Sequence, residues 1–318
     1  MVSSRAMHIV VLGAGAIGSL YGAKLAGVND VTLIGRPDHV RAIEQNGLRV
    51  EGIESQTIHV RAATQIEQLN PDTLILLTTK VPATALALEP VADLVRDDTT
   101  IIALQNGLNS EEVAREAVCG RGVVLRGITQ FGAIFERPGT IRYMVTGYTL
   151  LEKHDRSARI AAVLNAAGLD CGVSADITKE VWRKLVFNCV VNPITTIIGG
   201  EVGDIVDPHL SRLKQLVIDE CLAVARAEGI SLENNLMDQV NAAYAGSQNV
   251  VSMQQDLLRG HVTEIDYLNG AVAALGARHG VDCPVNTGLT HIIKGMEASR
   301  RAIPLSKFPR ELHEAKTN

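Results

Sequence analysis

The stretch HIVVLGAGAIG, residues 8–18, decides the fold of the N-terminal half of the chain. Its first five residues are the short apolar run that is typical of a buried parallel strand. Glycines follow in the spacing G-x-G-x-x-G, and the small residues from 16 to 27 suit a helix. Residues 31–34 form a second apolar run. Strand, glycine turn, helix and strand in this order predict a Rossmann-type dinucleotide half-site.

Each glycine of this loop has its own physical task. Gly13 permits a tight turn, Gly15 lets the backbone approach a pyrophosphate, and Gly18 lets the helix lie close to the strand. The helix start adds N–H donors and a partial positive charge. The predicted cofactor-binding residues of the loop are Gly13, Ala14, Gly15, Ala16, Ile17 and Gly18. The alternative is a glycine-rich turn that binds no ligand.

Arg36 indicates which dinucleotide is bound. A site selective for NAD places an acidic residue at the end of the second strand, where it binds the ribose 2′-hydroxyl. This chain has Arg36 there instead, and a guanidinium suits a 2′-phosphate. Arg36 therefore predicts NADP(H), with a solvated surface arginine as the alternative.

Two further apolar runs lie at residues 73–78 and 99–104. They alternate with helical patterns at 41–46, at 82–95 and after residue 110. We expect Ser110 to cap the last of these helices. Residues 47–60 suggest a hairpin around 51–55, and we expect residues 123–151 to extend the sheet with antiparallel strands. After residue 175 the pattern is helical almost throughout. The predicted fold is α/β, with a Rossmann-type doubly wound sheet in an NADP-binding domain (1–174) and an all-helical substrate domain (175–318).

Composition excludes several classes of function. A net charge of −5 in 318 residues provides no basic surface, so we expect no nucleic-acid partner. The five cysteines show no Cys-x-x-Cys and the nine histidines no ligand spacing, so we expect no metal, and reduced thiols in a cytoplasmic protein. No apolar run approaches the ~18 residues of a membrane span, so we expect no membrane partner. Residues 1–7 lack an apolar signal core and are expected to extend ahead of the first strand.

A line of polar residues runs along an otherwise apolar helical pattern at residues 180–193. Lys184, Asn188 and Asn192 follow one another at intervals of four, which places them on one helix face. A helix this apolar is expected to be buried, so its polar line must face hydrogen-bonding partners or a ligand. The alternatives are a satisfied buried network and, for Lys184, a lysine that extends to the surface. We expect Pro193 to kink or end the helix.

A lysine in such a place suits the reduction of a ketone. Addition of a hydride to a carbonyl puts negative charge on its oxygen, which an ammonium group stabilises and can protonate. Lys184 is therefore a candidate general acid.

Other polar residues stand where ligands commonly bind. Lys80 and Asn106 follow two of the predicted parallel strands, at the edge where such sheets bind ligands. Glu264 lies in the first turn of a helix expected over residues 263–279 and capped by Thr263 or His261, and Ser252 would cap another. Each residue has a structural alternative: a charged loop residue, an Asn-Gly turn, an acid that interacts with a helix dipole, or a simple cap.

Together these segments resemble the ketopantoate reductase (2-dehydropantoate 2-reductase) family over about residues 8–310. The matching stretches are GAGAIG (13–18), TKV (79–81), LQNG (104–107), KLVFNCVVNP (184–193), SMQQD (252–256) and TEID (263–266). The resemblance implies reduction of ketopantoate, a small 2-oxo acid, to D-pantoate by NADPH in pantothenate biosynthesis.

The resemblance also implies a role for each matching residue. Lys184 would be the general acid, and Glu264 would bind and orient the substrate and assist the lysine. Asn188 and Asn192 would line the substrate pocket. Ser252 would bind the substrate carboxylate, and Arg36 would bind the NADP phosphate. Asn106 would lie beside nicotinamide and substrate, and Lys80 would lie near cofactor and substrate.

One position departs from the family pattern. Val202 stands about where the family usually has an asparagine that contacts substrate, and a valine donates no hydrogen bond. The substrate therefore stays open: another 2-oxo acid or an imine is the alternative, and a non-catalytic NADP(H) sensor is a third. An all-helical second domain is compatible with a homodimer, which the sequence does not decide.

Overall fold

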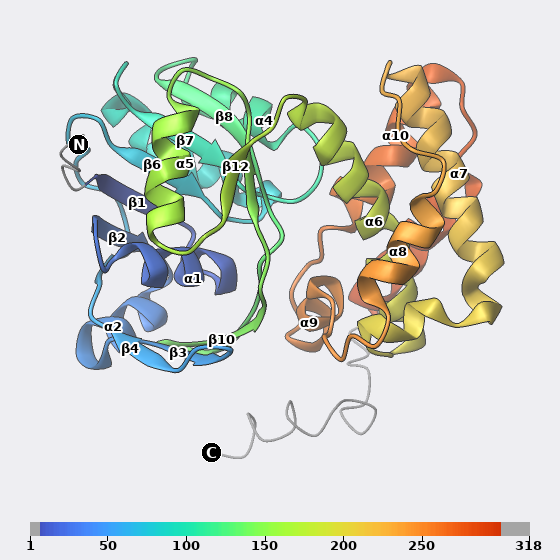
Figure 1. Ribbon diagram of the computed structural model, residues 1–318, viewed down its shortest axis with the longest axis horizontal. Coiled ribbons are helices and arrows are strands. Elements are labelled where there is room, and N and C mark those ends of the chain that lie inside the picture. Colours follow the sequence, from blue (N-terminus) through green and yellow to red (C-terminus); the bar gives the residue numbers. More distant parts are fainter. Residues whose placement is uncertain (1–6, 300–318) are drawn as a thin grey trace. The chain divides into compact units, whose positions relative to one another are not determined.

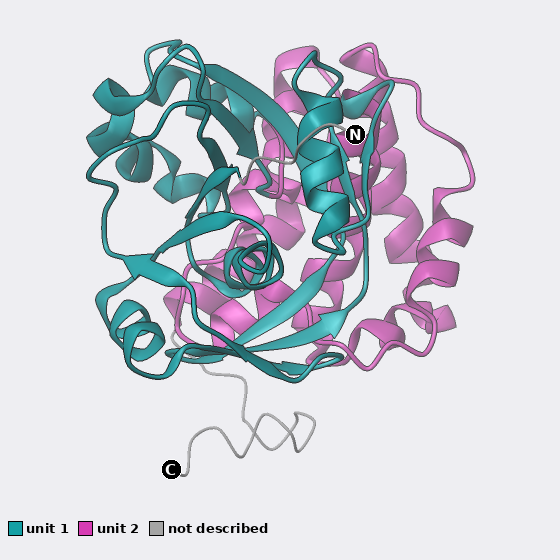
Figure 2. Cartoon of the chain, turned by 60° about the vertical axis from the view of Figure 1, so that its left-hand side comes forward, with its two compact units in different colours: residues 1–105, 109–177 teal, residues 106–108, 178–318 magenta. Residues whose placement is uncertain are grey.

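The computed structural model describes residues 7–299, in two compact units (Figure 2). Unit 1 contains the chain up to residue 105 and residues 109–177, and unit 2 contains residues 106–108 and the chain from 178 onward. The extension expected ahead of the first strand lies outside the described residues, apart from Met7. The predicted fold class is confirmed, because unit 1 is built on a largely parallel sheet and unit 2 is helical in all its described elements.

The main sheet of unit 1 has eight strands in the order β12-β11-β8-β7-β6-β1-β2-β5 (Figure 1). The strands from β8 to β5 along this order run parallel, whereas β11 pairs antiparallel with β8. Their bounds are β1 (His8–Leu12), β2 (Asp30–Ile34), β5 (Arg61–Ala63), β6 (Leu74–Leu77), β7 (Thr100–Ala103), β8 (Val123–Thr129), β11 (Thr149–Leu151) and β12 (Cys171–Val173).

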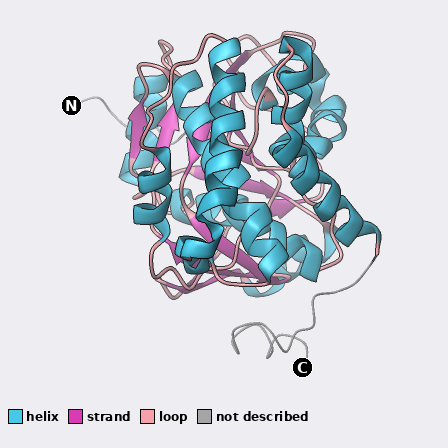
Figure 3. Ribbon diagram, turned by 90° about the vertical axis from the view of Figure 1, so that its right-hand side faces the viewer, coloured by secondary structure: helices cyan, strands magenta, loops and turns pink. Residues whose placement is uncertain are grey.

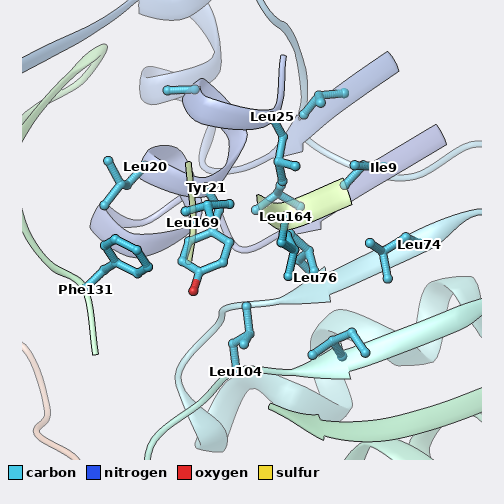
Figure 4. Close-up of a cluster of buried hydrophobic side chains, with 14 of the residues drawn as sticks. Ile9, Leu20, Tyr21, Leu25, Leu74, Leu76, Leu104, Phe131, Leu164 and Leu169 are labelled. Carbon is cyan, nitrogen blue, oxygen red and sulfur yellow. The ribbon is translucent and has the colours of Figure 1, made fainter. Parts of the chain in front are cut away.

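Hydrophobic cores lie on both faces of this sheet, as a doubly wound fold requires. Successive strand residues point to opposite faces. Leu74 and Leu76 accordingly join one core, whereas Ile75 and Leu77 join the other. The first core includes side chains of α1 (Ala16–Leu25) and α5 (Ser157–Ala166), and Figure 4 shows part of it around Tyr21. The second includes side chains of α3 (Thr84–Leu88) and α4 (Ser110–Ala117).

A second, four-stranded sheet corrects the expectation for residues 123–151. Only β11 extends the main sheet antiparallel; β9 (Gly132–Arg137) and β10 (Thr140–Val145) instead join β3 (Leu48–Gly52) and β4 (Gln56–Ile58). The predicted hairpin at 47–60 is confirmed as β3 and β4. β10 pairs parallel with β3 because tertiary contacts, which an alternating pattern does not encode, select the partner of a strand.

Three smaller predictions for unit 1 also change. Ser110 is the first residue of α4 rather than its cap, which is Asn109 in a left-handed conformation. The pattern at 82–95 folds as the short helix α3 between 3₁₀ turns at Val81–Ala83 and Glu89–Leu94. The helix predicted from residue 41 begins earlier, as α2 (Pro37–Asn46), and its C-cap is Gly47 with a φ of 76°.

A buried histidine joins α1, α2 and the β9–β10 turn. His39 of α2 is 1% exposed; its Nδ1 accepts the N–H of Gly139 (2.9 Å), and its Nε2 lies 3.1 Å from Ser19 Oγ. Because Nδ1 accepts, the proton of the neutral ring is on Nε2, which donates to the serine. Burial lowers the pKa of His39 to about 4.

We expect this histidine to make the fold sensitive to mild acid. Its folded-state pKa lies below the ordinary value of about 6.5, so the unfolded chain binds the proton first as the pH falls. The contribution of neutral His39 is complete above about pH 7 and is lost towards pH 4, where the loss reaches about 3 kcal/mol. Urea unfolding of wild type and His39→Gln at pH 7 and pH 4 measures it. Equal pH dependence in both proteins would contradict the prediction.

Unit 2 contains helices only among its described elements (Figure 3). Its core includes Leu185, Val217, Val272 and Ile293, each at most 1% exposed. The helices are α6 (Ile177–Ile198), α7 (Ser211–Ala227), α8 (Leu236–Tyr244), α9 (Ser252–Leu258), α10 (Asn269–His279) and α11 (Pro284–Ala298), and 3₁₀ turns span Val202–Val206, Pro208–Leu210 and Ile265–Tyr267. Within residues 7–299, no helix combines the length and apolarity that crossing a membrane requires.

Two helix-start predictions for unit 2 are wrong, and of the two outcomes expected at Pro193 the end of the helix does not occur. The helix expected over residues 263–279 is a 3₁₀ turn at Ile265–Tyr267, a break at Leu268 and then α10, so Glu264 precedes the turn rather than lying in a helix. Ser252 is the first residue of α9 and not its cap. Pro193 does not end α6, which continues to Ile198. Gly280 ends α10 in a left-handed conformation.

Candidate active site

The glycine loop lies at the point where the strand order of the main sheet reverses. From β1 the chain proceeds to β2 on one side and later to β6 on the other, so the carboxyl ends of β1 and β6 flank the switch point where such sheets bind ligands. Gly13 has a φ of 110°, and a Cβ there would lie 2.5 Å from the backbone nitrogen of Thr79. Thr78 Oγ1 donates a hydrogen bond to the Gly13 carbonyl (2.8 Å). The turn is therefore packed directly against the end of β6.

The other two glycines differ in what surrounds them. A Cβ at Gly18 would lie 2.2 Å from the Gly13 carbonyl oxygen, so packing of the helix on its own turn requires this glycine. A Cβ at Gly15 would meet no atom within 4 Å, so packing within the protein does not explain it. Open space at Gly15 suits a group that approaches the backbone closely, as a pyrophosphate does.

The start of α1 is also suited to an anion. Among the described residues no side chain caps α1, and its first turn carries no acidic residue. The amides of that turn therefore keep their donors for a ligand. The loop fits the phosphates of a dinucleotide.

Arg36 and Lys80 follow β2 and β6 at the same edge of the sheet. Arg36 is exposed and stands at the N-cap position of α2, and Lys80 is half-buried at the start of the 3₁₀ turn Val81–Ala83. Neither side chain caps the helix that it precedes.

Gln105, which sequence reasoning missed, connects two of these strand ends within unit 1. Its amide nitrogen donates to the Thr79 carbonyl (2.9 Å) and to Thr84 Oγ1 (2.6 Å). Its backbone carbonyl accepts from the guanidinium of Arg126 (2.9 Å), and Arg126 is 3% exposed. Its position between a buried strand and Asn106 is the feature of the sequence from which Gln105 could have been identified.

The predicted polar line lies on α6 in unit 2. Lys184 and Asn188 are half-buried, and Asn192 is buried at 7% exposure. The intervening Leu185 and Cys189 are in the core of the unit. Between residues 184 and 193 the helix therefore has one polar stripe with an apolar remainder, as its periodicity predicts.

Ion pairs hold the first turns of α6. Arg183 Nη2 and Lys179 Nζ both lie 2.8 Å from Glu233 Oε1, and Arg183 also pairs with Glu180. Hydrogen bonds from Arg183 and Lys179 lower the pKa of Glu233 to about 2. These partly exposed ion pairs join the first turns of α6 to the segment around Glu233.

Asn106 and Glu264 are brought together although they are far apart in sequence. Asn106 Nδ2 donates to Glu264 Oε2 over 3.2 Å, and residues 106–108 belong to unit 2. Gly107 adopts a φ of 84°, and a Cβ there would lie 2.6 Å from the Tyr267 carbonyl oxygen. The segment after β7 therefore packs closely on the turn that presents Glu264.

Val202 and Ser252 lie on two segments that are joined through the backbone. The Val202 N–H donates to the Asn249 carbonyl (2.8 Å), and its side chain is 4% exposed within the core. Ser252 is exposed at the start of α9, three residues after Asn249. The position that departs from the family pattern is thus apolar and covered.

Comparison with known proteins identifies the family. Residues 9–156 match the family described as "Ketopantoate reductase PanE/ApbA", and residues 176–297 match "Ketopantoate reductase PanE/ApbA C terminal". A 2-dehydropantoate 2-reductase of Pyrococcus horikoshii is 36% identical over 300 residues, which cover 92% of this chain and 98% of that protein. The chain belongs to the ketopantoate reductase family. A relative of the same name from Archaeoglobus fulgidus is 32% identical over 92% of this chain and 99% of its own length.

Solved structures of the ketopantoate reductase family and beyond share the fold. A PanE/ApbA family ketopantoate reductase from Ralstonia eutropha superposes with a TM-score of 0.86 at 29% identity, covering 93% of this chain and all of that one. A ternary structure of D-mandelate dehydrogenase with NADH and anilino(oxo)acetate also has a TM-score of 0.86, at 26% identity, covering 92% of this chain and 99% of that one.

Proposed function

We propose that this protein reduces 2-dehydropantoate to D-pantoate with NADPH, and that Lys184 is its general acid. The observation that carries the proposal is the pair of polar groups in unit 2: the Lys184–Asn188–Asn192 stripe of α6, and Glu264 bound by Asn106. Membership of the ketopantoate reductase family supports the reaction.

Unit 1 supplies the groups that would hold the dinucleotide. The loop from Gly13 to Gly18 would hold the pyrophosphate through the amides of the first turn of α1, Arg36 would bind the 2′-phosphate, and Lys80 would lie near cofactor and substrate. When bound, reduced nicotinamide supplies a hydride to the carbonyl carbon of the substrate. Relatives named 2-dehydropantoate 2-reductase and the NADH complexes of D-mandelate dehydrogenase support a nicotinamide cofactor.

Unit 2 supplies the groups that would act on the substrate. The ammonium of Lys184 would stabilise the negative charge that develops on the carbonyl oxygen and then donate a proton to it. Asn188 and Asn192 would orient the substrate by hydrogen bonds, and Ser252 would bind its carboxylate. Glu264, oriented by the amide of Asn106, would bind the substrate and assist the lysine.

A different 2-oxo acid is the second candidate substrate. Val202 places a buried apolar side chain where the family usually has an asparagine that contacts substrate. D-mandelate dehydrogenase shares the fold with a TM-score of 0.86, and its structure holds NADH and anilino(oxo)acetate. A pocket that lacks one amide donor would accept a more apolar 2-oxo acid at little cost.

Steady-state kinetics on a panel of 2-oxo acids tests the substrate. We expect kcat/KM for ketopantoate to exceed that for 2-oxoisovalerate, 2-oxoisocaproate and phenylglyoxylate. A higher value for one of the other acids would assign the enzyme to the second candidate. Absence of NADPH oxidation with every acid and with imines would favour a sensor of NADP(H).

Replacement of Arg36 tests the cofactor. Arg36→Ala is expected to raise KM for NADPH about 10- to 100-fold, because a charge-assisted hydrogen bond to the 2′-phosphate is lost, and to leave KM for NADH unchanged. Arg41→Ala, an exposed arginine on the same helix, is the matched control. Equal changes for both cofactors would contradict the assignment.

A further inference from the structure

The proline inside α6 leaves one backbone carbonyl without its helical partner. In an α-helix, the carbonyl of residue 189 would accept the N–H of residue 193, and a proline has none. Pro193 and Cys189 are both buried, so water does not readily replace the missing donor. A helix that nevertheless continues to Ile198 needs another donor at this carbonyl.

Asn269 supplies that donor. Its Nδ2 donates to the Cys189 carbonyl over 2.9 Å, and the asparagine is 0% exposed at the start of α10. The same nitrogen donates to Asn286 Oδ1 (2.9 Å), and Asn286 Nδ2 donates to Glu220 Oε2 (2.7 Å). The carboxylate of Glu220 also accepts the N–H groups of Val285 and Asn286 at the start of α11.

The hydrogen bond between Asn269 and Cys189 links α6 to the segment that follows Glu264. On α6, Cys189 directly follows Asn188, and Asn192 directly precedes the proline. On the other side, Asn269 follows Glu264 by five residues, after the 3₁₀ turn and the break at Leu268. One amide therefore connects the helix that carries the polar stripe to the segment that presents the carboxylate.

We propose that Asn269 is a positioning residue of the active site. Its amide replaces the N–H that Pro193 lacks, and so holds Asn188 and Asn192 at a fixed distance and angle from Glu264. The catalytic part of this inference rests on the proposed function, because it assigns those three residues to the substrate. If Asn269 only stabilised the fold, its replacement would lower the free energy of unfolding equally in the presence and in the absence of Pro193.

A double-mutant cycle with Pro193 separates these two roles. The variants are Asn269→Ala, Pro193→Ala and both together, with Asn286→Ala, alone and with Pro193→Ala, as the matched buried control. The measurements are kcat, the KM for ketopantoate and NADPH, and hydrogen exchange of the α6 amides. Pro193→Ala restores an N–H that can donate to the Cys189 carbonyl.

We expect Asn269→Ala to lower kcat/KM for ketopantoate about tenfold and to speed exchange in α6, with KM for NADPH unchanged. Pro193→Ala should restore most of the kcat/KM that Asn269→Ala removes. It should restore none of the kcat/KM that Asn286→Ala removes. Folding of Asn269→Ala only in the Pro193→Ala background would support the proposal in the same way.

Wild-type behaviour of Asn269→Ala would overturn the proposal, as would failure of Pro193→Ala to rescue it or equal rescue of the Asn286 variant. A wild-type protein that reduces no 2-oxo acid would overturn the proposed function instead. The exchange rates of α6 would then decide whether Asn269 substitutes for the proline N–H.

Discussion

Replacing Lys184 with methionine is expected to lower kcat for ketopantoate reduction by about 10²- to 10⁴-fold. The ammonium is the only charge among Lys184, Asn188 and Asn192, and methionine keeps most of the length of the side chain without the charge or the proton to be donated. The KM for NADPH should stay within about twofold, because the groups predicted to bind the dinucleotide are all in unit 1 apart from Asn106. Stopped-flow and steady-state NADPH oxidation measure both quantities.

Lys179→Met is the matched control for this prediction. Lys179 lies on the same helix, but its ammonium pairs with Glu233 on a segment that carries none of the predicted site residues. It should therefore retain the wild-type kcat. A kcat of Lys184→Met close to that of the control would remove Lys184 from the chemistry.

Glu264→Gln is expected to lower kcat/KM for ketopantoate about 10- to 100-fold. Glutamine keeps the shape of the side chain and an oxygen that can accept from Asn106, so the variant isolates the negative charge. Hydrogen bonds to charged groups contribute about 1.5–3 kcal/mol, which corresponds to this range. The effect should appear in kcat/KM for the 2-oxo acid and not in the KM for NADPH.

Asp266→Asn provides the comparison for Glu264. Asp266 lies in the adjacent 3₁₀ turn and is exposed, and it pairs with Lys294 over 2.8 Å. Its replacement removes one negative charge from the same segment without touching Asn106. If both variants lost activity equally, the charge of the segment rather than Glu264 itself would be responsible.

Local sequence predicted those features whose physical cause is local. The glycine loop at 13–18 could be located because tight turns and close helix packing exclude side chains at defined positions, and the structure shows this at Gly13 and Gly18. The polar stripe of α6 could be located because the helical period is a property of the backbone. The sequence also identified Asn106 and Glu264 as candidates, one by its place after a strand and one by its motif.

Interactions between distant segments could not be predicted in the same way. Nothing local to β9 and β10 indicates that they pair with β3 rather than with the main sheet. Helix ends at Ser110, Ser252 and Glu264 were also misplaced, since a residue that can cap a helix does so only where the incoming chain permits it.

The sequence by itself determined that unit 1 contains a Rossmann-type glycine turn and that Lys184, Asn188 and Asn192 share one face of α6, because both follow from sterics and backbone periodicity. Only the tertiary structure decided that Asn106 binds Glu264 across 158 residues and that α6 continues past Pro193. Asn269, 80 residues after Cys189, supplies the donor there. A proline removes a hydrogen bond wherever it stands, but whether the helix ends depends on a buried donor that only the folded chain brings to the vacant carbonyl.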